Sequence, residues 1–470
     1  MSSFFVTTDK LRIYFLITLL ILTSKLTSSE PCGTRHNSTW PWHVQLVDAN
    51  PTNRTVFCAG TLLSAQLVIT AAHCLHDRNG DPIELDRLLV LLANGDLRPA
   101  TNTFYPKPYD PKRLDHDVAM VALDRKVAFS NLVGPVCYAD FGKFEDVRSP
   151  AFGDRSLEMQ NEEACRQTTT KLFKLTYEKA ICLGAFNESH QYNQKAGSGL
   201  VIDSGSTWIL VGVLMYTTGQ SADQIDYAGG VSIERYYKWI GRVINHFSDP
   251  DLVNKKCKQY TGGREAISNI LYSVHVMDTQ VNQLCHGVIV SPRFVVTIAE
   301  CAKKTKRIMV YNGQSFKSQE VFAKAKVHYE EWNNKLALID LGRNISSPGS
   351  VISCLWNGRV VQNFTKVLSL RGGSLAEQYV SHVQYRPGSP LQVRYRCPAH
   401  QQHSWNKTFG DLIGVKVARE QRPRIAGLLD GVPPCDTFDH FYNRQRTAEA
   451  ISLQQYLPWI EDLVWRGGSG

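Results

Sequence analysis

The stretch that decides the fold is Gln194-Lys195-Ala196-Gly197-Ser198-Gly199-Leu200-Val201. Within it, Ser198 is a small polar residue between two glycines, and an apolar pair follows directly. Trp208 comes twelve residues after Ala196 and opens a further apolar run, Ile209-Leu210-Val211. Short apolar runs separated by glycine-containing turns are typical of β-strands, so we expect this loop to lie between strands of a sheet.

Three further strings of this kind precede that stretch. They are Phe57-Cys58-Ala59-Gly60-Thr61-Leu62-Leu63-Ser64, Val68-Ile69-Thr70-Ala71-Ala72-His73-Cys74 and Asp117-Val118-Ala119-Met120-Val121-Ala122-Leu123. Apolar and β-branched runs bounded by turns are what a buried barrel strand needs. The second string ends in His73-Cys74, and the third begins with Asp117.

Together these strings resemble the chymotrypsin-like or trypsin-like serine proteases, peptidase family S1. That family writes Gly-Asp-Ser-Gly-Gly-Pro-Leu-Val at its nucleophile, Thr-Ala-Ala-His-Cys at its general base and Asp-Ile-Ala-Leu at its third catalytic member. The resemblance implies that His73 and Asp117 are a remnant triad and that Ala196 stands where the nucleophilic serine belongs. Because alanine has no hydroxyl for the histidine to activate, the resemblance implies an inactive homologue, a pseudoprotease.

Other departures from the family pattern point the same way. Lys195 stands where the family has the aspartate that pairs with a new amino terminus, and Gln194 stands at the glycine of the oxyanion hole. Tyr192 occupies a cysteine position, and His190 occupies the position that sets trypsin-like specificity. The resemblance therefore implies no cleavage preference, and a restored serine alone is not expected to restore activity.

An alternative register makes Ser198 the nucleophile. It shifts Leu200-Val201 and Trp208 by two residues, which changes every core partner of the strands. A protease that uses Ser198 or Ser204 therefore stays open as an alternative.

The second half of the chain repeats the first. Sixteen positions separate Cys58 from Cys74, and sixteen separate Cys285 from Cys301. The repeat puts Glu300, Lys335 and Leu412 at the histidine, aspartate and serine positions, so this copy retains no triad residue. Each copy ends in an expected helix: Ile233, Tyr236, Tyr237, Ile240 and Val243 recur at helical spacing, and the Trp-Ile pair of 239–240 recurs at 459–460. Repetition of this kind indicates a duplicated domain.

The resemblance and the repeat also imply disulfides. The expected pairs are Cys58–Cys74, Cys285–Cys301, Cys165–Cys182, Cys32–Cys137 and Cys257–Cys354. Cys397 and Cys435 are left by elimination, and their pairing stays open. Twelve cysteines behind an amino-terminal signal indicate an oxidising compartment. Six glycosylation sequons agree with it: Asn37, Asn53, Asn187, Asn344, Asn363 and Asn406.

These observations predict the domain organisation. Residues 1–29 have basic residues before a short apolar run and are expected to be a secretory signal, with a retained membrane anchor as the alternative. No other segment is expected to span a membrane. The fold class is all-β, with two tandem chymotrypsin-like domains, each a pair of six-stranded antiparallel β-barrels with a C-terminal helix. The first domain is expected over 30–248, a linker over 249–256, the second domain over 257–466 and a flexible tail over 467–470.

Charge is unevenly spread along the chain. The formal net charge is +9; residues 255–470 hold 28 Lys/Arg and 16 Asp/Glu, and the remainder holds 24 and 27. The densest basic run, Lys303, Lys304, Lys306 and Arg307, is a solvated surface or a site for an anionic glycan. No metal, cofactor or nucleic-acid partner is predicted.

The first domain is similar to the inactive serine protease homologues of insects. That resemblance implies a secreted regulator that binds a protease, zymogen or inhibitor in an extracellular cascade such as melanisation or clotting.

Overall fold

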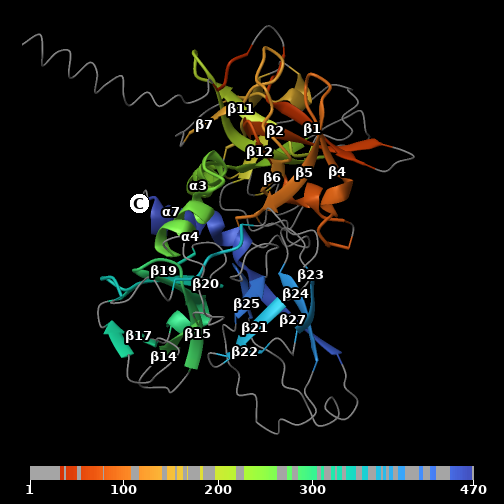
Figure 1. Ribbon diagram of the computed structural model, residues 1–470. Coiled ribbons are helices and arrows are strands. Elements are labelled where there is room, and N and C mark those ends of the chain that lie inside the picture. The colour runs from red at the N-terminus through yellow and green to blue at the C-terminus, as the bar shows by residue number, and fades with distance from the viewer. Residues whose placement is uncertain are drawn as a thin grey trace, which may run out of the picture.

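The structure is a computed structural model of the 470-residue chain. It describes residues 32–35, 39–49, 54–77, 79–106, 116–139, 146–153, 156–161, 163, 167, 180–183, 196–218, 227–261, 273–277, 284–303, 308–311, 319–322, 325–330, 335–345, 352–357, 367–371, 374–376, 380–384, 390–396, 412–415, 424–429 and 445–467. As expected, these residues are mostly β-strand, with a few helices between the first and second halves of the chain (Figure 1). No helix among them is long and apolar enough to cross a bilayer. The predicted signal lies outside them.

The first six strands along the chain form a closed barrel. Its strands are β1 (His43–Asp48), β2 (Thr55–Ser64), β3 (Leu67–Thr70), β4 (Leu88–Leu91), β5 (Leu97–Phe104) and β6 (Ala119–Leu123), in the order β1-β2-β3-β6-β5-β4. All neighbours along this order are antiparallel. Every residue of β3 and β6 is buried, as the unbroken apolar runs predicted.

A second sheet completes the first half. It contains β10 (Ala180–Leu183), β13 (Tyr227–Ser232), β12 (Trp208–Thr218) and β11 (Gly199–Asp203), with β7 (Cys137–Tyr138) parallel to β12. The short strands β8 (Asp146–Val147) and β9 (Leu157–Glu158) pair with each other. Single antiparallel bridges join Arg148 to Val201 and Met159 to Leu183. Through them β10, β13, β12, β11, β8 and β9 connect into a ring, with β7 outside it.

The second half repeats part of this plan. Its first sheet has the order β14 (Ser273–Met277), β15 (Leu284–Ile289), β16 (Phe294–Ile298), β20 (Leu336–Asp340) and β19 (Lys326–Tyr329), and β17 (Ile308–Tyr311) pairs with β18 (Gln319–Phe322). Its second sheet has seven strands, β22 (Ser374–Ala376), β21 (Val367–Arg371), β25 (Leu412–Val415), β26 (Arg424–Leu429), β27 (Gln445–Ser452), β24 (Leu391–Arg396) and β23 (Val380–Gln384). Among the described residues, neither sheet closes into the six-stranded barrel expected.

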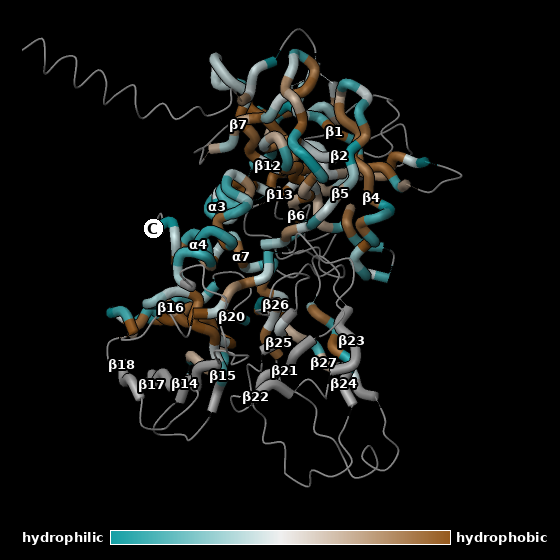
Figure 2. Tube along the Cα trace, in the orientation of Figure 1, coloured by the Kyte–Doolittle hydropathy of each residue, from teal (hydrophilic) through white to brown (hydrophobic). Residues whose placement is uncertain are grey.

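Each half has its own hydrophobic core. The two main clusters contain residues up to Val243 and from Val253 onward, respectively. Hydrophobic residues gather in the strands, whereas much of the helical region between the halves is hydrophilic (Figure 2).

A helix ends each half. The 3-10 turn η4 (Glu234–Tyr236) continues into α3 (Tyr237–Ser248), and η6 (Leu453–Tyr456) continues into α7 (Leu457–Trp465). The apolar residues Trp239, Ile240 and Val243 of α3 are buried.

The stretch 249–256 is not a plain linker. Three residues separate the end of α3 from the start of helix α4 (Leu252–Thr261). Val253 is 2% exposed and belongs to the core of the second half, and the Arg424 guanidinium donates a hydrogen bond to the Asn254 side chain. The sequence of α4 is polar and gives little apolar periodicity, so it does not predict a helix there.

Both halves contain disulfides. The bonds Cys32–Cys137, Cys58–Cys74 and Cys257–Cys354 are present. Cys182 and Cys301 are also disulfide-bonded. The side chains of their expected partners, Cys165 and Cys285, lie outside the described residues, as do Cys397 and Cys435.

Candidate functional site

The pairing of β3 with β6 brings His73 and Asp117 together. Thr70 pairs with Ala119; His73 lies three residues after that pair, in the short helix η1 (Ala72–Leu75), and Asp117 lies two residues before it. The Asp117 carboxylate accepts two hydrogen bonds, from the His73 backbone N–H at 2.7 Å and at 2.7 Å from Nδ1 of the ring. Asp117 is fully buried, so both bonds are shielded from water.

The imidazole of His73 is only partly covered, with 31% of its side chain exposed. Burial acts to lower its pKa, but the hydrogen bond and the charge of Asp117 outweigh burial and raise the pKa above the ordinary histidine value. The Asp117 contact also fixes the tautomer, because Nδ1 must carry the proton that it donates. This is the orientation that a general base requires.

Two further histidines flank this pair, and neither was predicted from the sequence to be a site residue. His76 Nδ1 lies 2.8 Å from the Ala72 carbonyl, and burial lowers the pKa of His76. His116 adopts a left-handed backbone conformation, φ 57°, and its Nδ1 lies 2.8 Å from the Tyr236 hydroxyl. The turn at His116 directs Asp117 into the interior. Its adjacency to Asp117 was the available sequence signal.

Ala196 lies beside the same disulfide as His73. The Ala196 carbonyl accepts a hydrogen bond from the Ala59 N–H at 2.8 Å and lies 3.7 Å from Cys74 Sγ. That sulfur lies 3.7 Å from His73 Nε2. The loop therefore brings a methyl side chain, with no nucleophilic atom, to the neighbourhood of the histidine.

Gly197 fixes the path of this loop. Its φ is +89°, and a Cβ atom there would collide with the Ala59 carbonyl oxygen and Thr70 Oγ1. Its N–H donates to the Leu214 carbonyl at 2.7 Å. Only glycine fits this position without strain.

The two alternative nucleophiles are poorly placed. Ser198 is fully buried, and its Oγ has no hydrogen-bond partner among the described residues, so it is neither accessible nor activated. Its carbonyl accepts from the Leu214 N–H, which holds it in the sheet. Ser204 donates its hydroxyl to the Thr207 carbonyl at 2.8 Å in the turn between β11 and β12.

Among the described residues, one group of side chains has the composition and spacing of metal ligands, but its two cysteines are not free thiols. Cys58, His73 and Cys74 lie close together. Because the two cysteines are joined in a disulfide, neither offers the thiolate that a metal requires.

The remaining predicted site residues are only partly described. Glu300 lies in α5 (Ala299–Lys303), and Lys335 is exposed just before β20, where its carbonyl accepts from the Ala299 N–H at 2.8 Å. The backbone of Leu412 lies in β25. Asn344 is exposed. The predicted residues outside the described part are His190, Tyr192, Gln194, Lys195, Lys304, Lys306, Arg307, Asn37, Asn53, Asn187, Asn363 and Asn406.

Comparison with known proteins identifies the family. The sequence profile of the trypsin family matches residues 33–240 and again residues 260–374. Inactive serine protease scarface of Drosophila melanogaster is 26% identical over 211 residues. That match covers 39% of this chain and 31% of the Drosophila protein, so the similarity concerns about a third of the relative's length. With two separate stretches matched, which together make up most of its length, the chain belongs to the trypsin family.

Proposed function

We propose that this protein is a secreted, catalytically inactive trypsin-family member that binds a protein partner in an extracellular proteolytic cascade. One observation carries the proposal. His73 Nδ1 and Asp117 Oδ2 are hydrogen-bonded at 2.7 Å, as in an active triad, yet the loop beside them has Ala196 in place of a serine. A general base without a hydroxyl cannot start acyl transfer.

Further features support it. The matched part of the Drosophila relative belongs to a protein named as inactive. Gln194 and Lys195 alter the positions that the family uses for its oxyanion hole and for its activating ion pair. The disulfides and the amino-terminal signal suit the oxidising compartment that an extracellular partner would share. A stable fold with a blocked reaction suits binding rather than turnover.

A labelling experiment tests the absence of catalysis. The secreted protein is treated with a fluorophosphonate probe, and labelled peptides are mapped, with an active trypsin as the positive control. We expect no labelled serine in the native protein and no peptide hydrolysis. We also expect Ala196→Ser to gain no turnover, because positions 194 and 195 remain altered. Labelling of Ser198 or Ser204 in the native protein would refute inactivity.

Partner binding needs its own test. The glycosylated protein is immobilised and incubated with its native extracellular fluid, and captured proteins are identified with and without excess soluble protein. Specific, competable capture of a protease, zymogen or inhibitor supports the proposal. Capture of none of these classes from fluid with an active cascade contradicts the cascade role.

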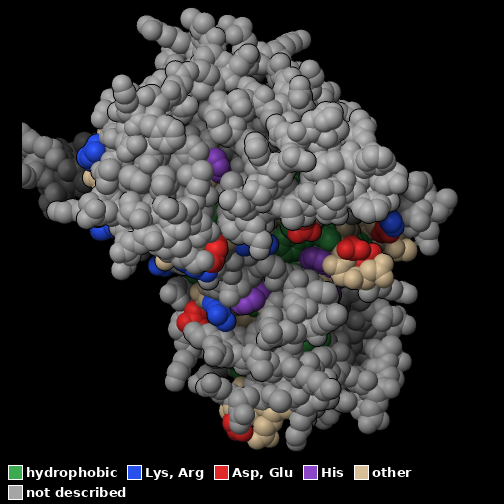
Figure 3. All heavy atoms as spheres, turned by 90° about the horizontal axis from the view of Figure 1, so that it is seen from below, with side chains coloured by type: hydrophobic (Ala, Val, Ile, Leu, Met, Phe, Trp, Pro, Cys, Tyr) green, Lys and Arg blue, Asp and Glu red, His purple; other side chains and the backbone are tan. Residues whose placement is uncertain are grey.

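The charge distribution favours a second candidate, a site for an anionic glycan on the second half. Of the basic run, Lys303 is described: it is half-exposed and lies 3.9 Å from Glu300. On the face drawn in Figure 3, the described basic and acidic side chains are interspersed. We expect the full chain to elute from heparin at higher salt than a variant with Lys303, Lys304, Lys306 and Arg307 changed to Ser. Identical elution would show that this run is only a solvated surface.

A further inference from the structure

The terminal helices of the two halves share the pattern Tyr-x-x-Trp-Ile. Trp239-Ile240 of α3 corresponds to Trp459-Ile460 of α7, and a tyrosine precedes each helix, at 236 and 456. This correspondence pairs Arg242 with Asp462 as equivalent positions in the two copies. Equivalent positions in a duplicated fold ordinarily lie far apart, one in each copy.

In this structure the two equivalent residues meet. Arg242 Nε lies 3.2 Å from Asp462 Oδ2, and their side chains are 12% and 5% exposed. Beside this pair, His246 Nδ1 lies 2.9 Å from Glu461 Oε1, and both side chains are buried. The two helices therefore face each other through charged groups that are largely removed from water.

A third contact closes the end of the interface. Arg466, just after α7, donates a hydrogen bond to the Asn245 carbonyl at 2.7 Å and lies 3.7 Å from Glu461 Oε2. Glu461 is thus held between a histidine of the first half and an arginine of its own half. Figure 1 shows α3, α4 and α7 gathered between the two halves.

The strands beside the helices contribute equivalent residues as well. Phe104 pairs with Met120 in the first half, and His328 pairs with Leu338 in the second half. Because the β6 and β20 sequences correspond, Phe104 and His328 occupy the same place in the two copies. Two residues beyond each of them come Pro106 and Glu330.

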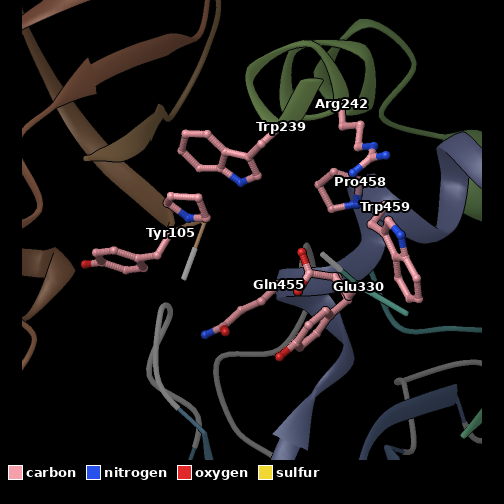
Figure 4. A pocket seen from close by; sticks show the side chains of 9 residues that line it. Tyr105, Trp239, Arg242, Glu330, Gln455, Pro458 and Trp459 are labelled. Atoms are coloured by element: carbon pink, nitrogen blue, oxygen red, sulfur yellow. The ribbon is translucent and has the colours of Figure 1, made fainter. Parts of the chain in front are cut away.

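These strand ends and helices meet around a small cavity (Figure 4). Its lining includes both members of two equivalent pairs, Trp239 with Trp459 and Pro106 with Glu330. The cavity volume is about 30 Å³, space for about two water molecules and too little for an organic ligand. The cavity is therefore a packing gap between equivalent surfaces of the two halves and not a binding pocket.

We propose that the two halves associate as an intramolecular pseudo-dimer, in which the same surface of each copy, the terminal helix with the end of the neighbouring strand, packs against its counterpart. In a true twofold interface, position 242 would face itself, and two arginines would repel each other. In this chain the first half has Arg242 at this position and the second half has Asp462, which have opposite charges. Each half therefore binds the other half better than it would bind a second copy of itself. Charge complementarity of this kind sets partner choice.

Among the described residues, the association of the two halves is noncovalent apart from a short chain connection. Only residues 249–251 lie between α3 and α4, and none of the three disulfides between described cysteines crosses from one half to the other. Helix α4 is fixed to the second half by Cys257–Cys354. The packed helices must therefore hold the halves together if the connection is cut.

Cutting that connection tests the proposal on the full chain. A recognition sequence for a specific protease is placed at 249–251, and the folded, secreted protein is cleaved and run on size exclusion under non-reducing conditions. We expect the two halves to co-elute. Asp462→Arg places like charges at the two equivalent positions and should raise the dissociation constant of the cleaved halves by at least about 100-fold, because a buried charge is left without a partner.

The exchange variant separates this mechanism from general misfolding. Arg242→Asp combined with Asp462→Arg restores opposite charges and should restore co-elution. Arg87→Asp is the matched control, since it breaks an exposed pair with Asp48 inside the first half and should leave the halves together. Separation of the unsubstituted halves, unchanged association of Asp462→Arg, or failure of the exchange variant to be secreted or to co-elute would each overturn the proposal.

Discussion

Asp117 is expected to support the fold of the first half independently of any catalysis. In Asp117→Ala, the backbone N–H of His73 and its ring Nδ1–H lose their common acceptor. Each is a hydrogen bond to a buried carboxylate, and such bonds contribute about 1.5–3 kcal/mol apiece. We therefore expect Asp117→Ala to lower the free energy of unfolding by about 3–6 kcal/mol.

Two further variants calibrate that value. Asp117→Asn keeps a carbonyl oxygen for one of the two donors and should cost less than Asp117→Ala. Asp48→Ala removes a partly exposed carboxylate that pairs with Arg87 and should cost less than about 1 kcal/mol. Asp48 is a matched control for Asp117 because both carboxylates belong to the first half and both have a basic side chain as partner.

Calorimetry of the full chain measures the effect, with the transition of the second half as an internal reference. A loss in Asp117→Ala no larger than that in Asp48→Ala would refute the reasoning. It would mean that the remnant pair is retained for something other than stability.

Three other predictions follow from the site and from the second half. Because the pKa of His73 is higher in the folded than in the unfolded protein, its pairing with Asp117 stabilises the fold fully below a pH of about 6.5 and less as the pH rises through the folded pKa. Asp117→Asn should lower the pKa of His73 in an NMR titration and flatten this part of the stability profile, and an unchanged pKa would contradict the assignment. Gly197→Ala should destabilise the first half by about 2–4 kcal/mol in denaturant unfolding, from left-handed strain and overpacking, whereas Gly205→Ala, with a similar φ and open space around it, should cost only about 1–2 kcal/mol; equal losses would refute the collision at Gly197. The Arg293 guanidinium holds the pKa of Asp340 below its usual range against the effect of burial, so Arg293→Ala should cost about 1 kcal/mol at neutral pH and nothing once acid has protonated Asp340; a loss that persists in acid would point to packing instead.

Strands and the remnant site were accessible from sequence because their signals are local and dense. The run from Val68 to Cys74 fixes a buried strand, a turn and a disulfide partner within seven residues. The pairing of that strand with β6 then determines where Asp117 lies. Such strings predict both secondary structure and side-chain proximity, since the register of neighbouring strands leaves little freedom.

The interface between the halves was missed for a physical reason. Arg242, Glu461 and Asp462 are charged residues on helices, and charges at such positions are usually solvated. Their burial depends on another helix more than two hundred residues away, and no local pattern encodes that. Tyr237 shows the opposite error: it fits the apolar spacing of the helix but is 39% exposed at the first residue of α3.

The contact between Arg242 and Asp462 has an evolutionary consequence. After a gene duplication the two copies of a position ordinarily drift apart, each constrained only by its own fold. Here positions 242 and 462 constrain each other, because a change of sign at one leaves a buried charge unmatched at the other. Orthologous sequences should therefore show compensated changes at this pair, and single-domain members of the family should show no such constraint at the corresponding helix position.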